Sequence, residues 1–432
     1  MFDKLLDLFR HKEIRNRILF TLAIFCLYRL GAAIPVPKVD SAALMAGTNK
    51  DSLDLLAMLN LLGGGLFERF SIFAMGVGPY ITGSIVIQLL SMDVIPYLTE
   101  LTKTGAEGKR KLDQITRYFG LVLAFAQAYA LTYSFNVQYG ILADGKISTY
   151  LFVATILTAG SMFLLWIADR ISMYGVGNGI SMIIFAGIVS NYPTMFSGIY
   201  ASLVGGSDSA SRVNGLLMFV GYIAMFLVII LGVIFVGNAV RKIPIQYTSS
   251  NLARGRKDVN FLPLRINSAS VIPVIFSSAI MTAPMTILSF FKPTPFSTAL
   301  GNILNIQKPW GLAIYVVLII LFTFFYTNLQ VDPQTTAENL NKNNTYIPGI
   351  RPGVETKEYI TKVLNRITVM GAISIAAIGA LPYLISMFTN LPASYSLGGT
   401  GIIIVVGVAQ ETIKDLMGQL TQKTYKGFKR KF

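Results

Sequence analysis

Ten long, mainly apolar stretches separated by polar segments repeat along the whole chain. An apolar run of about 20 residues is long enough for an α-helix to cross the hydrocarbon core of a bilayer. The pattern therefore predicts an all-α polytopic membrane protein with ten transmembrane helices. We expect these spans at residues 18–35, 71–92, 115–135, 150–168, 180–199, 215–236, 271–291, 310–330, 367–388 and 399–416.

The composition supports this prediction and narrows the function. Of the 432 residues, 53% are hydrophobic and only 13% are charged, whereas a typical soluble protein has a charged fraction of about 25%. A single cysteine (Cys26) and a single histidine (His11) exclude a disulfide framework and disfavour zinc or haem chemistry. The chain has no GxxxxGK[ST] phosphate-binding motif, and its spans contain almost no ionisable side chains. We therefore expect no enzyme activity, no cofactor and no metal.

Loops rich in Lys and Arg alternate along the chain with loops that have few or none. They concentrate in the amphipathic N-terminal segment 1–17, the loops 93–117, 237–269 and 331–366, and the tail 417–432. Because loops rich in Lys and Arg remain in the cytoplasm, both termini and the two long basic loops, 237–269 and 331–366, are predicted to be cytoplasmic.

Loops 237–269 and 331–366 are longer than membrane orientation requires. Both are basic and contain prolines and glycines, and long loops of this kind commonly carry function. Their charge either only sets the orientation of the chain or also binds an acidic or nucleic-acid partner.

Two spans contain a proline near their start, Pro79 in the second and Pro273 in the seventh. Proline removes a helical hydrogen bond and is expected to kink the helix. If residues 18–199 and 215–416 are two five-span halves joined externally by 200–214, these prolines occupy corresponding positions. Because each half has five spans, an odd number, the two halves must be inverted relative to each other in the membrane. In inverted repeats, paired interrupted helices point to the working site.

Branched apolar residues recur at helical spacing in the second and fifth spans. Val77, Ile81 and Ile85 are four residues apart, as are Ile180 and Ile184, and Ile275 follows Pro273. Such faces either pack against lipid and other helices or form an apolar constriction that closes a pore by excluding water.

Six segments of the chain are similar to those of a known family. They are GPYITGSIVIQLL, GVGNGISMIIFAGIV, LPLRINSASVIPVIFSSAI, IPGIRPG, TKEYITKVLNRIT and GGTGIIIVVGVAQETIKDLMGQL. In order and spacing they resemble the SecY family, the channel subunits of the bacterial protein translocase. The resemblance implies two inverted pseudo-symmetric halves around a central hourglass pore. Unfolded polypeptides would cross the membrane through this pore, and transmembrane segments would leave it sideways into lipid.

The resemblance also implies roles for individual residues, carried over by position. The pore ring would comprise Val77, Ile81, Ile180, Ile184, Ile275 and Ala409, although many relatives have a bulkier residue at the last place. The lateral gate, between spans 2–3 and 7–8, would include Ile85, Gln88, Asn267, Ser277 and Ser278. A motor or ribosome would contact Arg241, Lys242, Arg254, Arg256, Lys257 and Arg351. Alternatively, Arg351 only caps its own loop.

The segment 61–70 resembles the family's plug, a short helix folded back into the external funnel. It includes Leu62, Gly63, Gly64, Gly65, Leu66, Phe67, Glu68 and Arg69. Three glycines disfavour a stable helix, and a charged pair in hydrocarbon is costly. In a plug, the glycines would permit detachment and the charges would face water.

The implied setting is the bacterial cytoplasmic membrane. The implied partners are SecE and SecG, the SecA motor ATPase or the ribosome, signal peptides and nascent chains, and anionic lipids, with SecDF and YidC as further candidates. Two other functions stay open on the residues alone. A secondary transporter of an apolar solute would share the broken helices but needs polar or acidic groups beside them. An insertase without a pore would need a polar groove instead of an apolar ring.

Overall fold

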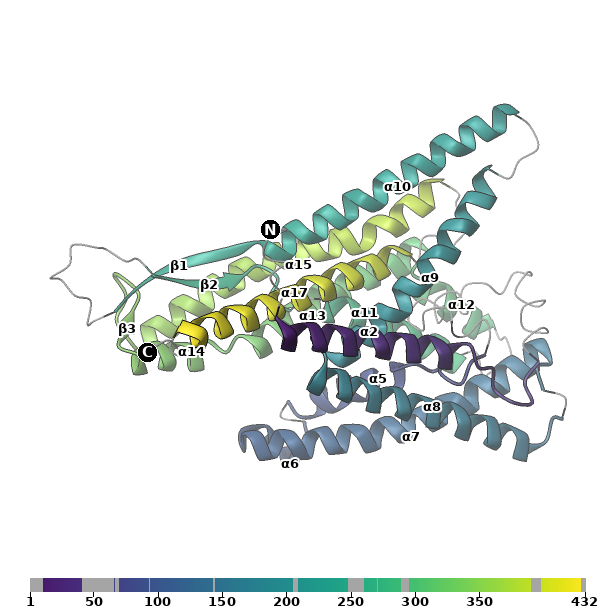
Figure 1. The fold of residues 1–432 in the computed structure, drawn as a ribbon, viewed down its shortest axis with the longest axis horizontal. Helices are drawn as coiled ribbons and strands as arrows, with labels where there is room; N and C mark the ends of the chain where they lie inside the picture. The colour runs from purple at the N-terminus through teal and green to yellow at the C-terminus, as the bar shows by residue number, and fades with distance from the viewer. Residues whose placement is uncertain are drawn as a thin grey trace.

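The computed structural model describes residues 11–40, 66, 70–92, 94–142, 144–204, 209–247, 260–269, 271–288, 295–389 and 398–428. Within these residues, ten helices coincide with the ten predicted spans (Figure 1). They are α2 (Lys12–Ala32), α5 (Gly78–Leu90), α7 (Ala106–Tyr139), α8 (Ile147–Tyr174), α9 (Gly179–Val204), α10 (Ser209–Asn238), α11 (Ile272–Leu288), α13 (Pro309–Gln330), α15 (Val354–Thr389) and α17 (Gly398–Phe428). The prediction of an all-α chain with ten apolar helices is confirmed.

Six of these helices are long and apolar enough to cross a membrane by length and composition, within the residues described. They are α7, α8, α9, α10, α13 and α15. The helix α5 and the first part of α11 are shorter apolar helices, whereas α2 and α17 combine an apolar stretch with a charged end.

The two prolines explain why α5 and α11 are short. Pro79 lies in the first turn of α5, and Pro273 is the second residue of α11. Proline is well tolerated there because the first backbone N–H groups of a helix have no intrahelical acceptor. The prediction that these prolines kink their helices is therefore wrong, because each proline lies at the start of a helix. Residues 71–77, predicted to begin the second span, form consecutive turns instead.

The helices form two groups that follow the two halves of the sequence (Figure 1). In the N-terminal half, α7 packs against both α5 and α8, and α8 packs against α2 and α9. In the C-terminal half, α13 packs between α11 and α15, while α10 and α17 lie together. The groups meet where α5 contacts α11 and where α9 contacts α10 and α17.

The two long basic loops pair in a small sheet that the hydropathy pattern did not predict. Strands β1 (Val240–Tyr247) and β2 (Asn260–Arg265) form an antiparallel hairpin, and β3 (Thr345–Tyr346) pairs with the other edge of β1. The hairpin packs with α14 (Pro333–Lys342) and the start of α15 around a separate apolar core that includes Ile243 and Leu364. The loops therefore form one folded surface at one end of the molecule (Figure 1).

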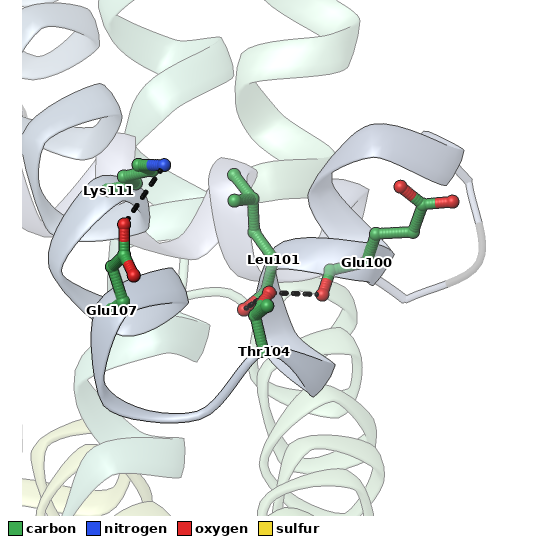
Figure 2. A network of polar contacts seen from close by, with 5 residues as sticks. All are labelled: Glu100, Leu101, Thr104, Glu107 and Lys111. Carbon is green, nitrogen blue, oxygen red and sulfur yellow. Dashed lines mark hydrogen bonds and ion pairs between the residues drawn. The ribbon is translucent and has the colours of Figure 1, made fainter.

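Two further helices lie between the predicted spans. One is α12 (Pro295–Leu304), before α13, and the other is α6 (Pro96–Lys103), which turns sharply into α7 (Figure 2). At that corner the Thr104 hydroxyl donates hydrogen bonds to the carbonyl oxygens of Glu100 (2.8 Å) and Leu101 (3.2 Å). Gly108 is required there, because a Cβ at this position would lie 1.8 Å from the Leu101 carbonyl oxygen.

Helix α8 packs directly on the irregular segment 71–77. We expect Gly160 of α8 to be required at this contact. A Cβ on Gly160 would lie 2.1 Å from the Ile72 carbonyl oxygen. Gly160→Ala should therefore lower the free energy of unfolding by about 1–3 kcal/mol through overpacking. Thermal unfolding in detergent measures this effect. The control is Gly221→Ala on α10, where nothing lies within 4 Å of the added Cβ. Equal melting temperatures of the two variants would contradict the expectation.

Candidate functional site

Five predicted pore-ring residues belong to one large hydrophobic cluster that contains residues of both halves. Val77, Ile184 and Ile275 are buried members of one hydrophobic cluster, and Ile81 and Ile180 pack against it. We call these five residues the ring cluster. They come from the start of α5, from α9 and from α11, so three helices that are distant in sequence supply one apolar centre.

The sixth predicted residue, Ala409, is not part of the large hydrophobic cluster that contains these five residues, whereas Val408 is a buried member and Val405 packs against it. The contacts of α17 with α9 show which face of α17 points inward. A Cβ on Gly401 would lie 2.9 Å from Cγ2 of Ile188, and the Thr412 hydroxyl lies 3.6 Å from the Met182 sulfur. By helical spacing, Val405 and Val408 share the face of α17 that carries Gly401 and Thr412.

Most of the predicted plug, residues 62–65 and 67–69, lies outside the described residues. Leu66 is described and belongs to the same hydrophobic cluster as the ring residues, with 2% of its surface exposed. Its carbonyl oxygen accepts a hydrogen bond of 3.2 Å from the Ser71 backbone N–H. The segment that leads into α5 therefore carries an apolar side chain into the ring region.

A hydrogen bond joins the two halves at the predicted lateral gate. The Tyr326 hydroxyl of α13 donates to Oε1 of Gln88 on α5 at 2.7 Å. The Gln88 amide in turn donates to Ser84 Oγ at 3.3 Å. Tyr326 is also packed edge-on against Phe276 of α11, with ring centroids 5.1 Å apart. The sequence analysis named Gln88 but missed Tyr326, although a tyrosine inside an apolar span signals a hydroxyl that needs a partner.

The other predicted gate residues have different surroundings. Ile85 is buried in the same cluster as the ring. Ser277 and Ser278 are buried, but their hydroxyls donate within α11, to the carbonyl oxygens of Pro273 and Ile275, both at 2.8 Å. The hydroxyls of these two serines are therefore satisfied within α11, whereas Gln88 accepts a hydrogen bond from the opposite half.

Asn267 lies between β2 and α11 and faces other helices of the C-terminal half. It lines a cavity of about 40 Å³ whose other walls come from α10, α15 and α17. Its Oδ1 atom is buried and has no hydrogen-bond partner among the described residues. The structure thus places Asn267 beside the last helix of the C-terminal half, and not beside Gln88.

Arg351 lies at the tip of an exposed turn, residues 348–353, which we call the docking turn. Gly349 (φ +83°) and Gly353 (φ +103°) have left-handed backbone conformations that glycine adopts without strain. The Arg351 side chain is 88% exposed, and its only ion pair in the described structure is a long contact of 3.9 Å with Glu355. The guanidinium is therefore held outward and is available to a partner.

The same surface carries further charges. Arg241 and Lys242 are exposed on β1, and pairing of β1 with β3 places the hairpin beside the chain that leads to the docking turn. Arg254, Arg256 and Lys257 lie outside the described residues. Asp332 caps α14, and a hydrogen bond from the Thr335 side chain lowers the pKa of its carboxyl group. This surface is therefore mixed in charge, with cations at its exposed tips.

The described residues contain no group of three His, Cys, Asp or Glu side chains suited to hold a metal ion. Their arrangement instead offers an apolar centre, a polar contact between the halves and an exposed basic surface. Comparison with known proteins identifies the family.

The family model of SecY matches residues 71–413. The protein translocase subunit SecY of Staphylococcus carnosus is 45% identical over 432 residues, covering 99% of both chains. SecY of Staphylococcus aureus strain NCTC 8325 is 44% identical over 431 residues, again covering 99% of each chain.

Solved structures with the same fold include a protein-conducting channel, with a TM-score of 0.64 and 17% identity. A second is a structure on the plug domain of the SecY protein, with a TM-score of 0.64 and 19% identity. A third is Sec61 in the canine ribosome–channel complex of the endoplasmic reticulum, with a TM-score of 0.62 and 16% identity. Each alignment covers 93% of this chain and 92% of the other. Together with the sequence relatives, these matches show that this chain belongs to the SecY family of protein-conducting channel subunits.

Proposed function

We propose that the chain carries unfolded secretory polypeptides across the bacterial cytoplasmic membrane, between its two halves, and releases apolar segments sideways into lipid. Both termini and the basic sheet would face the cytoplasm, in agreement with the distribution of Lys and Arg. The observation that carries this proposal is the ring cluster, which lies where the two halves meet and includes residues from α5, α9 and α11.

The ring cluster would be the narrowest part of the path. Water entering a narrow apolar neck gives up hydrogen bonds, so such a neck excludes water and ions while a polypeptide can still pass it. We propose that Val405 and Val408 supply the contribution of the last helix, in place of Ala409, because they pack in this cluster. Leu66 would place the plug directly against the ring.

The Gln88–Tyr326 hydrogen bond would hold the lateral gate closed. It is the polar contact between α5 and α13, and the aromatic packing of Phe276 on Tyr326 adds α11 to the same contact. A sufficiently apolar segment arriving in the pore would replace these contacts with its own and separate the helices.

The exposed basic surface would receive the partner that supplies the polypeptide. SecA or the ribosome would dock on the docking turn and the β1–β2 hairpin, because Arg351, Arg241 and Lys242 are exposed there. The comparisons include Sec61 in a ribosome–channel complex and yeast Ssh1 bound to the 80S ribosome. SecE and SecG would complete the membrane complex.

Replacing ring residues with polar ones should make the closed channel leak ions. Lowering the barrier to wetting by about 1.4 kcal/mol would raise the frequency of conducting openings about tenfold. We expect this for Ile81→Asn and Ile184→Asn, measured as single-channel current in planar bilayers. The matched control is Leu121→Asn on the exposed face of α7. A silent baseline in both ring variants would show that these residues only pack the core.

Removing the hydroxyl of Tyr326 should loosen the gate. A double-mutant cycle of Tyr326→Phe and Gln88→Leu should show a coupling of about 0.5–1.5 kcal/mol in unfolding free energy. Tyr326→Phe should also let less apolar signal sequences open the channel in a translocation assay. Tyr200→Phe, an exposed tyrosine on α9, is the control. Additive single effects, with unchanged signal selectivity, would contradict the gate role.

Reversing the charge of Arg351 should stop transport without unfolding the channel. Breaking a desolvated charged contact with a partner costs about 2–5 kcal/mol, enough to weaken docking by tens- to thousands-fold. Because the side chain is 88% exposed, the melting temperature of Arg351→Glu should stay close to that of the parent. Translocation into vesicles and thermal unfolding measure both effects, with Lys362→Glu on α15 as control. A loss of transport fully explained by lower stability would rule out docking.

A further inference from the structure

The small sheet leaves two lengths of strand edge without a neighbouring strand in the described residues. Its strands lie in the order β2-β1-β3, and β3 pairs only with Gln246 and Tyr247 of β1. The outer edge of β2 is therefore unpaired, and so is the edge of β1 before Gln246, which we call the open edge of β1. The N–H and C=O groups of such an edge are a template on which another chain can add as a strand.

The register shows which residues face these two edges. The Ile266 N–H donates to the Ala239 carbonyl oxygen at 3.0 Å, so these two residues form a hydrogen-bonded pair. In an antiparallel ladder, hydrogen-bonded pairs alternate with pairs whose backbone groups point away from the partner strand. The outward-pointing pairs are therefore Val240–Arg265, Lys242–Pro263 and Pro244–Phe261.

Each edge has a proline among these outward positions. Pro263 faces the outer edge of β2, and Pro244 faces the open edge of β1. Proline has no N–H to donate to an added strand, and within sheets it is confined to such edge positions. Both prolines are exposed, and the core beneath the sheet contains Ile243 and Leu264 instead. Filling the core therefore does not account for either proline.

Other groups beside the two prolines are already occupied. On β2, the Ser268 hydroxyl donates to the Arg265 carbonyl oxygen at 2.9 Å, next to the outward position where Pro263 lacks its N–H. On β1, Pro244 is the outward residue next to Gln246, which pairs with β3. A strand added to β2 would lose hydrogen bonds at two successive outward positions, and one added to β1 could not continue the ladder of β3.

We propose that Pro263 and Pro244 prevent the sheet from binding the polypeptide that the channel carries. This inference rests on the proposed function, in which an unfolded chain with an unpaired backbone passes the cytoplasmic end of the molecule. Strand addition gains its affinity from main-chain hydrogen bonds, so an open edge would retain many different extended sequences. The two prolines make transport independent of the tendency of a substrate to form strands.

The experiment restores the missing donor at each edge and compares two substrates. Pro263→Val and Pro244→Val each add an outward N–H in a residue type that favours strands. Asn260→Val is the matched control, because residue 260 belongs to a hydrogen-bonded pair and its N–H already points toward β1. One secretory substrate contains a segment of alternating Val and Thr. The other has proline at every second position of that segment, so it cannot pair as a strand.

Two quantities are measured for each variant, together with its melting temperature. The first is the initial rate of motor-driven transport of each substrate into vesicles, expressed as the ratio of the two rates. The second is the affinity of the channel in lipid nanodiscs for each segment as a labelled peptide, measured by fluorescence anisotropy.

Pro263→Val should bind the Val/Thr peptide about tenfold more tightly than the parent does, which corresponds to about 1.4 kcal/mol, and should transport that substrate several-fold more slowly. Pro244→Val should act in the same direction. The proline-containing substrate should be unaffected in both variants, and Asn260→Val should match the parent. A ratio of rates and a peptide affinity equal to those of the parent in both proline variants would overturn the inference.

Equal slowing of both substrates, or slowing explained by a lower melting temperature, would overturn the inference too, since the prolines would then serve docking or stability. A parent that transports neither substrate would instead remove the proposed function, and this inference with it.

Discussion

The packing of apolar side chains between the two halves is the interaction on which the rest of this molecule depends. Residues of the first half and the second half bury their surfaces in a common cluster, to which Leu66, Ile184 and Ile275 all belong. In a membrane, lipid competes equally well for apolar side chains, so close packing and a few hydrogen bonds must hold such an interface. An interface of this kind can be tight when closed and can still open.

Backbone chemistry decides where the path through the molecule can be irregular. In hydrocarbon every N–H and C=O group needs a partner, so non-helical chain is tolerated only inside protein or beside water. The turns of residues 71–77 meet this condition, since the Ser161 hydroxyl donates to the Gly76 carbonyl oxygen at 2.8 Å. The close approach of Gly160 keeps α8 against the same segment. A short α5 is thus a consequence of placing its start in the protein interior.

The basic sheet and the gate are linked through covalent structure as well as through packing. Strand β2 ends at Arg265 and α11 begins at Ile272, so the basic sheet and the contact of Phe276 with Tyr326 are close along the chain. Both are built from weak, exchangeable contacts, such as the 3.9 Å ion pair of Arg351 and the single hydrogen bond of Tyr326. Strong contacts at either place would oppose the motion that transport requires.

The sequence alone determined the number and order of the helices, because burial in lipid demands long apolar runs and leaves little freedom in how they are read. Pro79 and Pro273 also drew attention to α5 and α11. The sequence predicted kinks at these prolines, whereas the structure begins a helix at each. The resemblance to the SecY family named Gln88 and the five residues of the ring cluster, and all five belong to one large hydrophobic cluster that spans both halves. The orientation of the termini and the plug stay predictions.

Tertiary structure decided what depends on pairing between distant residues. Strands β1 to β3 are short and carry little of the hydropathy signal that reveals spans, and their pairing joins loops almost 100 residues apart. The contact of Tyr326 with Gln88, 238 residues away, is visible only in the folded chain. The contact of α17 with α9 sets which face of α17 is turned inward, and Val405 and Val408, unlike Ala409, belong to the large hydrophobic cluster. Helical periodicity gives the faces of a helix, but only its neighbours decide which face points inward.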